Sequence, residues 1–195
     1  MEQRGQFEVR SQAVEWARQV AGDPGTIYLD TETTGLNSSA EIVDVGVVDS
    51  DGNTLLDTLV CPTCAIPPDA TRIHGITDDM VRDAPVWPDI YPVLRRILGE
   101  YRRIVIYNAD FDCRVMNQVN RLHRYPEFLA DWQCAMKRFA EYQGVWHTKY
   151  GNWRWHRLDQ AAKTFNHPEP SIHRALSDAQ MCRSVVLGMA GATGD

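Results

Sequence analysis

Two carboxylates, Asp30 and Glu32, stand two residues apart at the end of a short apolar segment, residues 27–29. On a β-strand, residues two apart point to the same face, and their Cα atoms lie about 6.6 Å apart. Two like charges at this distance repel each other unless a positive group lies between them. A turn follows at residues 33–35, and α/β folds place their binding sites where a buried strand ends beside such a turn. The pair therefore indicates a cation-binding site, with a solvent-facing polar edge as the plainer alternative.

A third carboxylate, Asp112, follows an apolar segment at 103–107 and lies where a helix is expected to begin. The helix dipole favours a carboxylate in the first helical turn, so capping explains Asp112 without any further chemistry. Asp110 and Asn108 compete for the same capping role. From these residues alone, Asp112 is interpreted as a cap.

A fourth carboxylate, Asp178, belongs to the last expected helix. The residues three before it and four after it, Ala175 and Cys182, belong to the apolar stripe of that helix. A buried carboxylate is costly unless a cation or a hydrogen-bond donor accompanies it. Either an arginine elsewhere in the chain or a metal ion shared with other carboxylates would satisfy Asp178.

His173 lies five residues before Asp178. Five steps along a helix would leave the two side chains about 140° apart, so both can face one site only if His173 lies in the loop before the helix. A histidine in such a loop suits a general base near neutral pH. A surface histidine without a role is the alternative.

Three other patterns could carry chemistry. Cys61 and Cys64 have the spacing of zinc ligands, but a tetrahedral site needs four ligands and no second pair follows, so we interpret them as incidental. Residues 146–157 interleave aromatic and basic side chains, a composition that could stack nucleobases or form an ordinary packed loop. His74 is interpreted from its neighbours as part of a turn before a helix capped by Thr77.

Strands and helices that alternate along the chain must position these residues, and such alternation is typical of an α/β fold. The prediction is a mixed β-sheet, a three-strand antiparallel meander plus helix-linked strands, flanked by helices. Strands are expected at residues 26–31, 42–49, 54–60 and 103–107, and helices at 11–21, 89–99, 111–122, 134–143, 157–165 and 175–189. The first strand should place Ile27, Leu29 and Thr31 on one face and Tyr28, Asp30 and Glu32 on the other, and the apolar stripe of the helix at 111–122 should comprise Phe111, Val115, Val119 and Leu122.

The length of 195 residues fits one domain at 25–190, with an N-terminal helical arm at 1–24 and a flexible tail at 191–195. No apolar run reaches the roughly 18–20 residues that span a bilayer. The odd number of cysteines, five, and the absence of an apolar signal segment favour a cytoplasmic protein. The chain has 26 acidic and 20 basic residues, and its net charge of −6 argues against tight binding of long duplexes driven by salt-dependent contacts.

Four segments, taken together, resemble the DEDDh branch of the DEDD superfamily, the proofreading-subunit-like 3′–5′ exonucleases. Residues 29–36, 108–112 and 173–179 resemble its three acidic motifs, and residues 73–77 resemble its Ile-His-Gly-Ile-Thr segment. Each segment alone is a weak signal, but all of them occur in order and extend over most of the chain. A histidine separated from the final aspartate by four intervening residues matches the histidine branch rather than the tyrosine branch.

The resemblance implies an RNase H-like fold and two Mg²⁺ or Mn²⁺ ions per active site. It selects Asp112 rather than Asp110 as the counterpart of the catalytic carboxylate. The implied metal ligands and catalytic residues are Asp30, Glu32, Asp112 and Asp178, with His173 as the general base. The implied substrate contacts are Thr33, Thr34, Gly35 and Leu36, which match the turn that holds the terminal nucleotide, and His74, Asn108 and Phe111, which match positions lining the nucleotide pocket.

The resemblance therefore implies a metal-dependent 3′–5′ exonuclease that releases 5′-mononucleotides from single-stranded or frayed DNA. An exonuclease acting on RNA is the first alternative, because recognition of the 2′-hydroxyl depends on pocket contacts. A non-catalytic module that holds 3′ ends or a polymerase is the second, although all five acidic and histidine positions are present. Nucleic acid 3′ ends are the expected partner, no membrane is expected, and a polymerase or a second copy of the chain is left open. Residues 130–134 and the long segment 146–155 depart from the family pattern and leave the substrate preference open.

Overall fold

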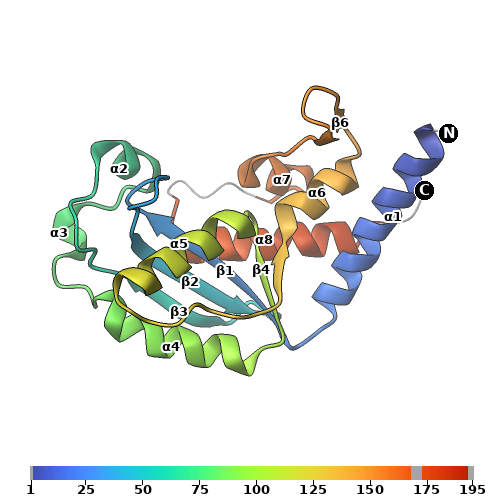
Figure 1. Ribbon diagram of the computed structural model, residues 1–195. Helices are drawn as coiled ribbons and strands as arrows, with labels where there is room; N and C mark the ends of the chain where they lie inside the picture. The colour runs from blue at the N-terminus through green and yellow to red at the C-terminus, as the bar shows by residue number, and fades with distance from the viewer. Residues whose placement is uncertain (1, 168–172, 193–195) are drawn as a thin grey trace.

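The computed structural model describes residues 2–167 and 173–192, and five of its strands form one mixed sheet. The sheet order is β3-β2-β1-β4-β5, in which β1, β2 and β3 pair antiparallel and β4 and β5 run parallel to β1 (Figure 1). This arrangement confirms the predicted meander followed by helix-linked strands. The strands are β1 (Thr26–Thr33), β2 (Ile42–Asp49), β3 (Thr54–Leu59), β4 (Arg103–Ile106) and β5 (Trp132–Cys134).

Helices cover both faces of this sheet (Figure 1). One face packs against α1 (Glu2–Ala21), α6 (Ala135–Gln143), α7 (Leu158–Thr164) and α8 (Ala175–Ala190). The other face packs against α4 (Trp87–Glu100) and α5 (Ala109–Leu122). Two short helices, α2 (Pro68–His74) and α3 (Asp78–Val81), follow β3, and a separate hairpin joins β6 (Trp146–His147) to β7 (Asn152–Trp153). No helix in the described ranges has the length and apolarity that crossing a membrane requires.

The first strand divides its side chains between the two cores as the sequence predicts. Ile27 and Leu29 are buried against α4 and α5, whereas Tyr28 is buried on the face that carries α8. Because side chains alternate along a strand, Asp30 and Glu32 follow Tyr28 onto the α8 face. The apolar half of β1 anchors the strand, and the polar half is left facing the start of α8.

Strand β2, which lies between β3 and β1, allows α8 to lie close against the sheet. Seven of its eight residues are buried, which is expected of a strand covered on both faces. A Cβ atom added at Gly46 would lie 2.2 Å from the backbone nitrogen of Leu176, so only glycine fits below the first turn of α8. This contact sets the height of α8 above β1.

Two expectations were wrong in detail. The first helix begins at Glu2 rather than at Ser11, because its N-terminal half is held by α6, where Gln6 Nε2 donates to the Gly144 carbonyl at 2.5 Å. Leu122 is 55% exposed, because the buried face of α5 is centred on Met116 and Leu122 lies to one side of it. The sequence analysis also did not predict β5, whose three residues are too few for a period-two pattern. Residues 193–195 of the expected tail lie outside the described residues.

Candidate active site

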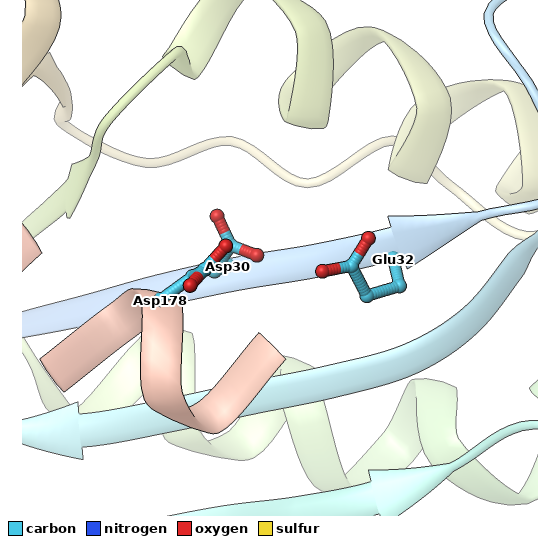
Figure 2. A group of neighbouring side chains, drawn as sticks. All are labelled: Asp30, Glu32 and Asp178. Atoms are coloured by element: carbon cyan, nitrogen blue, oxygen red, sulfur yellow. The ribbon is translucent and has the colours of Figure 1, made fainter. Parts of the chain in front are cut away.

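Three carboxylates meet where β1 passes under the start of α8. Oxygen atoms of Asp30, Glu32 and Asp178 all lie within 4.8 Å of one another. Figure 2 shows Asp30 and Glu32 on β1 and Asp178 on α8, with the three side chains around a common space. Within the described part of the chain, this is the only group of three or more acidic, histidine or cysteine side chains with metal-binding geometry.

Asp112 adjoins this group from α5 and is oriented by β1. Its Oδ1 accepts hydrogen bonds from the Thr31 backbone N–H at 3.2 Å and from the Thr31 hydroxyl at 2.7 Å. The side chain is therefore buried against β1 and does not serve as the helix cap that its position suggested. Asp110 is exposed and pairs with Lys137 on α6 at 2.7 Å. Asn108 is the N-cap residue by position, although its side chain makes no capping hydrogen bond.

The electrostatics of the carboxylate group call for a cation. Burial first, and then the charges of Asp112 and Asp178, raise the pKa of Asp30 well above its ordinary range. Burial and the charge of Asp178 likewise raise the pKa of Glu32 to about 8. Burial raises the pKa of Asp112 to about 7, against the opposing effect of the two hydrogen bonds from Thr31. Such shifts mark a site where negative charge is concentrated without internal compensation.

One oxygen of Asp178 has no hydrogen-bond partner among the described residues. Oδ1 is buried and accepts no hydrogen bond from the described residues. An unsatisfied buried carboxylate oxygen is costly, and a metal ion would satisfy it. The donor set around it consists of carboxylate oxygens, which are the ligands that hard divalent cations such as Mg²⁺ and Mn²⁺ prefer. The residues present therefore fit divalent metal ions.

His173 contacts the other oxygen of Asp178. The structure places His173 just before α8, as the spacing predicted, and Nδ1 lies 3.2 Å from Asp178 Oδ2. The imidazole side chain is 37% exposed. A neutral imidazole that donates from Nδ1 presents Nε2 as a proton acceptor. The contact thus satisfies Asp178 on one side and fixes a basic nitrogen beside the carboxylate group.

A buried ion pair that the sequence analysis missed holds the start of α8. Asp44 on β2 is fully buried and accepts hydrogen bonds from Arg174 Nε at 2.7 Å and from the Ala175 backbone N–H at 3.1 Å. Arg174 separates His173 from the helix, so this pair positions both the histidine and the first turn that carries Asp178. An aspartate and a glycine inside the otherwise apolar run of β2 were the available signals.

The turn after β1 is tied to the chain by its own hydrogen bonds. The Thr33 hydroxyl donates to the Gly35 carbonyl at 2.8 Å, and the Thr34 N–H donates to the Glu41 carbonyl at 2.8 Å. Both threonines are buried. Leu36 is 78% exposed, which is unusual for an apolar side chain beside a polar site and suits contact with a ligand.

His74 supports this turn from the last residue of α2. The side chain is 2% exposed, Nδ1 accepts from the Ile76 N–H at 3.0 Å, and Nε2 lies 3.3 Å from the Thr33 carbonyl. Burial lowers the pKa of His74, so the ring is neutral with Nε2 as the donor. Both ring nitrogens are therefore engaged within the protein.

The N-terminal half of α5 completes the same side of the site. Phe111 is partly buried, and the Arg114 guanidinium lies 5.2 Å from the centre of its ring. Arg114 also donates to the Leu36 carbonyl at 3.3 Å. Arg114 thus joins Leu36 of the turn to Phe111 of α5, whereas Asn108 is exposed at the start of this helical segment.

The cysteine pair and the aromatic segment have separate structural explanations. Cys61 and Cys64 are free and belong to no metal-binding group among the described residues, and the loop between them is held by Glu41, which accepts from the Thr63 N–H at 2.9 Å. Trp146 and Trp153 pack edge to face across the β6–β7 hairpin with ring centres 5.0 Å apart. These two tryptophans therefore stabilise the hairpin itself.

Comparison with known proteins agrees with this geometry. A family model described as "Exonuclease" (RNase T) matches residues 27–186. The chain is 43% identical over 171 residues to "Uncharacterized exonuclease CP81" of Escherichia phage 186, covering 84% of this chain and 87% of that protein. It is 30% identical over 169 residues to "Exodeoxyribonuclease 10" of Escherichia coli (strain K12), covering 85% and 69%.

A solved structure shares both sequence and fold. The structure titled "Exonuclease X in complex with 5′ overhanging duplex DNA" matches at 30% identity with a TM-score of 0.59, over 87% of this chain and 95% of that chain. The match confirms the RNase H-like α/β fold that the motifs implied. This chain therefore belongs to the exonuclease family, in the DEDDh branch of 3′–5′ exonucleases.

Proposed function

We propose that this exonuclease hydrolyses the terminal phosphodiester at the 3′ end of single-stranded or frayed DNA and releases 5′-mononucleotides, with two Mg²⁺ or Mn²⁺ ions. The observation that carries the proposal is the convergence of Asp30, Glu32 and Asp178 around one space, with Asp112 adjoining them and His173 in contact with Asp178. A phosphodiester is an anion and would be repelled by this group without cations.

The four carboxylates would hold the metal ions. Two divalent ions, when bound, reverse the local field, activate a water and stabilise the attacking and leaving oxygens of an in-line displacement. The unpartnered Asp178 Oδ1 and the raised pKa values of Asp30 and Glu32 support this assignment. The carboxylate of Asp112 is oriented by the hydrogen bond that it accepts from Thr31 on β1, rather than by a contact within its own helix.

His173 is the proposed general base. Asp178 holds Nδ1, so Nε2 is the nitrogen that accepts the proton of the attacking water. Arg174, anchored on Asp44, keeps the histidine beside the site. Proton transfer by a positioned base contributes roughly 10²–10⁴-fold to such reactions.

The turn after β1 is proposed to hold the terminal nucleotide. Leu36 and Phe111 offer apolar and aromatic surface to the base, while the backbone around Thr33–Gly35 approaches the sugar and its 3′ hydroxyl. His74 acts on this subsite through Thr33, whose carbonyl it contacts. We assign His74 a positioning role here, because its two ring nitrogens are already engaged.

DNA is the proposed substrate because the two 30%-identical matches are a named exodeoxyribonuclease and an exonuclease bound to overhanging duplex DNA. The acidic composition favours a short stretch of frayed or single strand over a long duplex. Divalent ions held by the carboxylates would attract the phosphate in place of a basic surface.

The test is digestion of matched 5′-labelled oligonucleotides of single-stranded DNA, duplex DNA and RNA with Mg²⁺, Mn²⁺ or EDTA. We expect a metal-dependent ladder shortening from the 3′ end, fastest on single-stranded DNA. Asp112→Asn should lower kcat at least about a thousandfold, because metal stabilisation of the transition state supplies several kcal/mol.

The matched control is Asp110→Asn, which removes an exposed carboxylate from the same helical turn and should retain nearly full activity. Equal losses in the two variants would show that the effect is not specific to the site. A faster ladder on RNA would overturn the DNA assignment, and no ladder from folded, metal-loaded protein would overturn the enzyme assignment.

A further inference from the structure

A pocket opens beside His173, the neighbour of Asp178, and no residue of the Thr33–Leu36 turn lines it. It has a volume of about 410 Å³, within the range of small-ligand sites. The chain directly before α8 contributes His173, and the N-cap position of α5 contributes Asn108. The floor and far wall are formed by Tyr107, which follows β4, by Met136 on α6, and by residues 155–159, which extend from the β6–β7 hairpin into the first turn of α7.

The far wall is a built structure rather than a loose loop. The Tyr107 hydroxyl, at the end of β4, donates to the His156 carbonyl at 3.0 Å. The His156 ring packs edge to face on Phe139 with centres 5.5 Å apart. The Arg154 N–H donates to the Val145 carbonyl at 2.8 Å, which closes the hairpin directly before this wall. These contacts hold the segment at a fixed distance from the carboxylate group.

Trp155 is the exposed aromatic face of this wall. The side chain is 56% exposed and makes no ring contact with the described part of the chain, unlike Trp146 and Trp153, which pack on each other. A large apolar ring that is held in place and uncovered in a pocket favours a stacking partner. His156, in the same wall, has a buried Nε2 without a hydrogen-bond partner among the described residues.

The position of the pocket identifies the ligand. A phosphodiester at the carboxylate group joins two nucleosides, one on each side of the phosphate being cleaved. Leu36 and Phe111, which Arg114 joins, do not line this pocket. Trp155 and Asn108 line it together with Met136 of α6 and Leu158 of α7, and in Figure 1 α6 and α7 are separated from α2 and the turn after β1.

We propose that this pocket binds the nucleotide immediately 5′ of the scissile phosphate, with its base stacked on Trp155 and its sugar or phosphate within reach of Asn108. The proposal rests on the proposed function, because it uses the same carboxylate group as the point of cleavage. It makes Trp155 a residue that determines substrate length, since a substrate without a second nucleoside gains nothing from the pocket.

The test compares two substrates of the holoenzyme with Mn²⁺. One is a single-stranded oligonucleotide, and the other is the p-nitrophenyl ester of thymidine 5′-monophosphate, which has the terminal nucleotide and a chromogenic leaving group but no second nucleoside. Trp155→Ala should raise KM for the oligonucleotide about tenfold, as expected for loss of one base stack, and change KM for the ester less than about twofold. Trp155→Phe should restore most of the affinity.

Trp146→Ala is the matched control, because Trp146 has a similar exposed fraction, 51%, but lies in the hairpin outside the pocket. An abasic residue at the penultimate position should raise KM of the wild-type enzyme as Trp155→Ala does and should add nothing in that variant. An abasic residue deep within the strand should have no effect.

The outcomes separate the two proposals. If Trp155→Ala loses activity equally on both substrates, or behaves like Trp146→Ala on the oligonucleotide, the second subsite is overturned while the exonuclease assignment stands. If the wild-type enzyme hydrolyses neither substrate, the proposed function fails, and the subsite fails with it.

Discussion

Strands β1 and β2 both carry buried carboxylates, but within the described part of the chain the negative charge is compensated only on β2. Glu32 pairs across the ladder with Asp44, and Asp30 pairs with Gly46. Asp44 is fully buried but receives a guanidinium from Arg174 and a backbone N–H from Ala175. Asp30 and Glu32 form no salt bridge with a described lysine or arginine, and a third carboxylate, Asp178, approaches them instead.

The difference separates a structural acid from functional ones. An internal cation at Asp44 joins the start of α8 to the sheet and needs nothing from solution. The carboxylates on β1 repel one another in the absence of a cation. This repulsion is unfavourable in the metal-free protein and favours the binding of a cation. Replacing Asp44 on β2 should therefore destabilise the protein, whereas replacing Asp30 or Glu32 on β1 should stabilise the metal-free protein.

The largest effect is expected at the glycine opposite Asp30. Gly46→Ala would place a Cβ atom 2.2–2.4 Å from backbone atoms of Ala175 and Leu176, and backbone cannot move aside cheaply. We expect a loss of about 3 kcal/mol in the free energy of unfolding, together with loss of activity because Asp178 moves with α8. Urea denaturation and oligonucleotide digestion measure the two effects.

Gly99→Ala in α4 is the matched control, since a Cβ there meets nothing within 4 Å. That change should stabilise the protein by roughly 0.5–1 kcal/mol, as alanine does inside a helix. A Gly46→Ala protein as stable as the wild type would show that β2 does not set the height of α8.

The next largest effect is expected at Asp44. Asp44→Ala removes the acceptor of three hydrogen bonds and leaves the partly buried Arg174 with Asp57, 3.8 Å away, as its remaining salt-bridge partner among the described residues. We expect the free energy of unfolding, measured by urea denaturation, to fall by about 2 kcal/mol. This is less than for a fully buried ion pair, because Arg174 is partly exposed. Added Mg²⁺ should not remove this difference.

Asp57→Ala provides the comparison, because Asp57 faces the same arginine at longer range and is 45% exposed. The free energy of unfolding of Asp57→Ala should fall by no more than about 0.5 kcal/mol. If the two variants were equally stable, the buried hydrogen bonds of Asp44 would not be what anchors α8.

The third effect has the opposite sign and appears on β1. The pKa of Glu32 is raised by burial and by Asp178 from 4.5 to about 8, so the folded protein binds this proton more tightly than the unfolded chain. Its contribution to stability is present below pH 4.5 and is lost as the pH rises through 8. The Tm of the metal-free protein should therefore fall between pH 5 and pH 8.

Glu32→Gln should reduce that fall and raise Tm at pH 8 by a few degrees, while leaving Tm at pH 5 nearly unchanged. Mg²⁺ should raise the wild-type Tm at pH 8 more than that of the variant. A wild-type Tm that is independent of pH in EDTA would contradict the repulsion on which the comparison rests.

The sequence predicted the fold class and the candidate site residues because both leave local patterns. Alternation in β1 correctly assigned Tyr28, Asp30 and Glu32 to one face, and the five-residue spacing correctly placed His173 in the loop before the last helix. Helix length was less predictable, as α1 shows, because packing against the end of α6 extends it beyond the expected range of 11–21.

Long-range pairings left no such pattern. Asp112 looked like a cap by itself because its partner, Thr31, lies 81 residues away, and the motif resemblance alone distinguished it from Asp110. The motif resemblance implied a substrate contact for His74, and only the fold revealed that its ring is buried against the Thr33 carbonyl. The sequence left the aromatic segment open as a stacking surface or a packed loop, whereas the fold separates the hairpin tryptophans from Trp155.

The sequence by itself determined which residue types are present and their faces on strands and helices, and the resemblance of its motifs implied the reaction class. The faces follow from periods of 2 and 3.6 residues, which act over a few neighbours. Only the tertiary structure decided that Arg174 neutralises Asp44 and not Glu32, that Gly46 lies under α8, and that Trp155 lines a pocket beside His173. Those relations join residues far apart in the chain, and they are set by how the helices pack on the sheet rather than by local sequence.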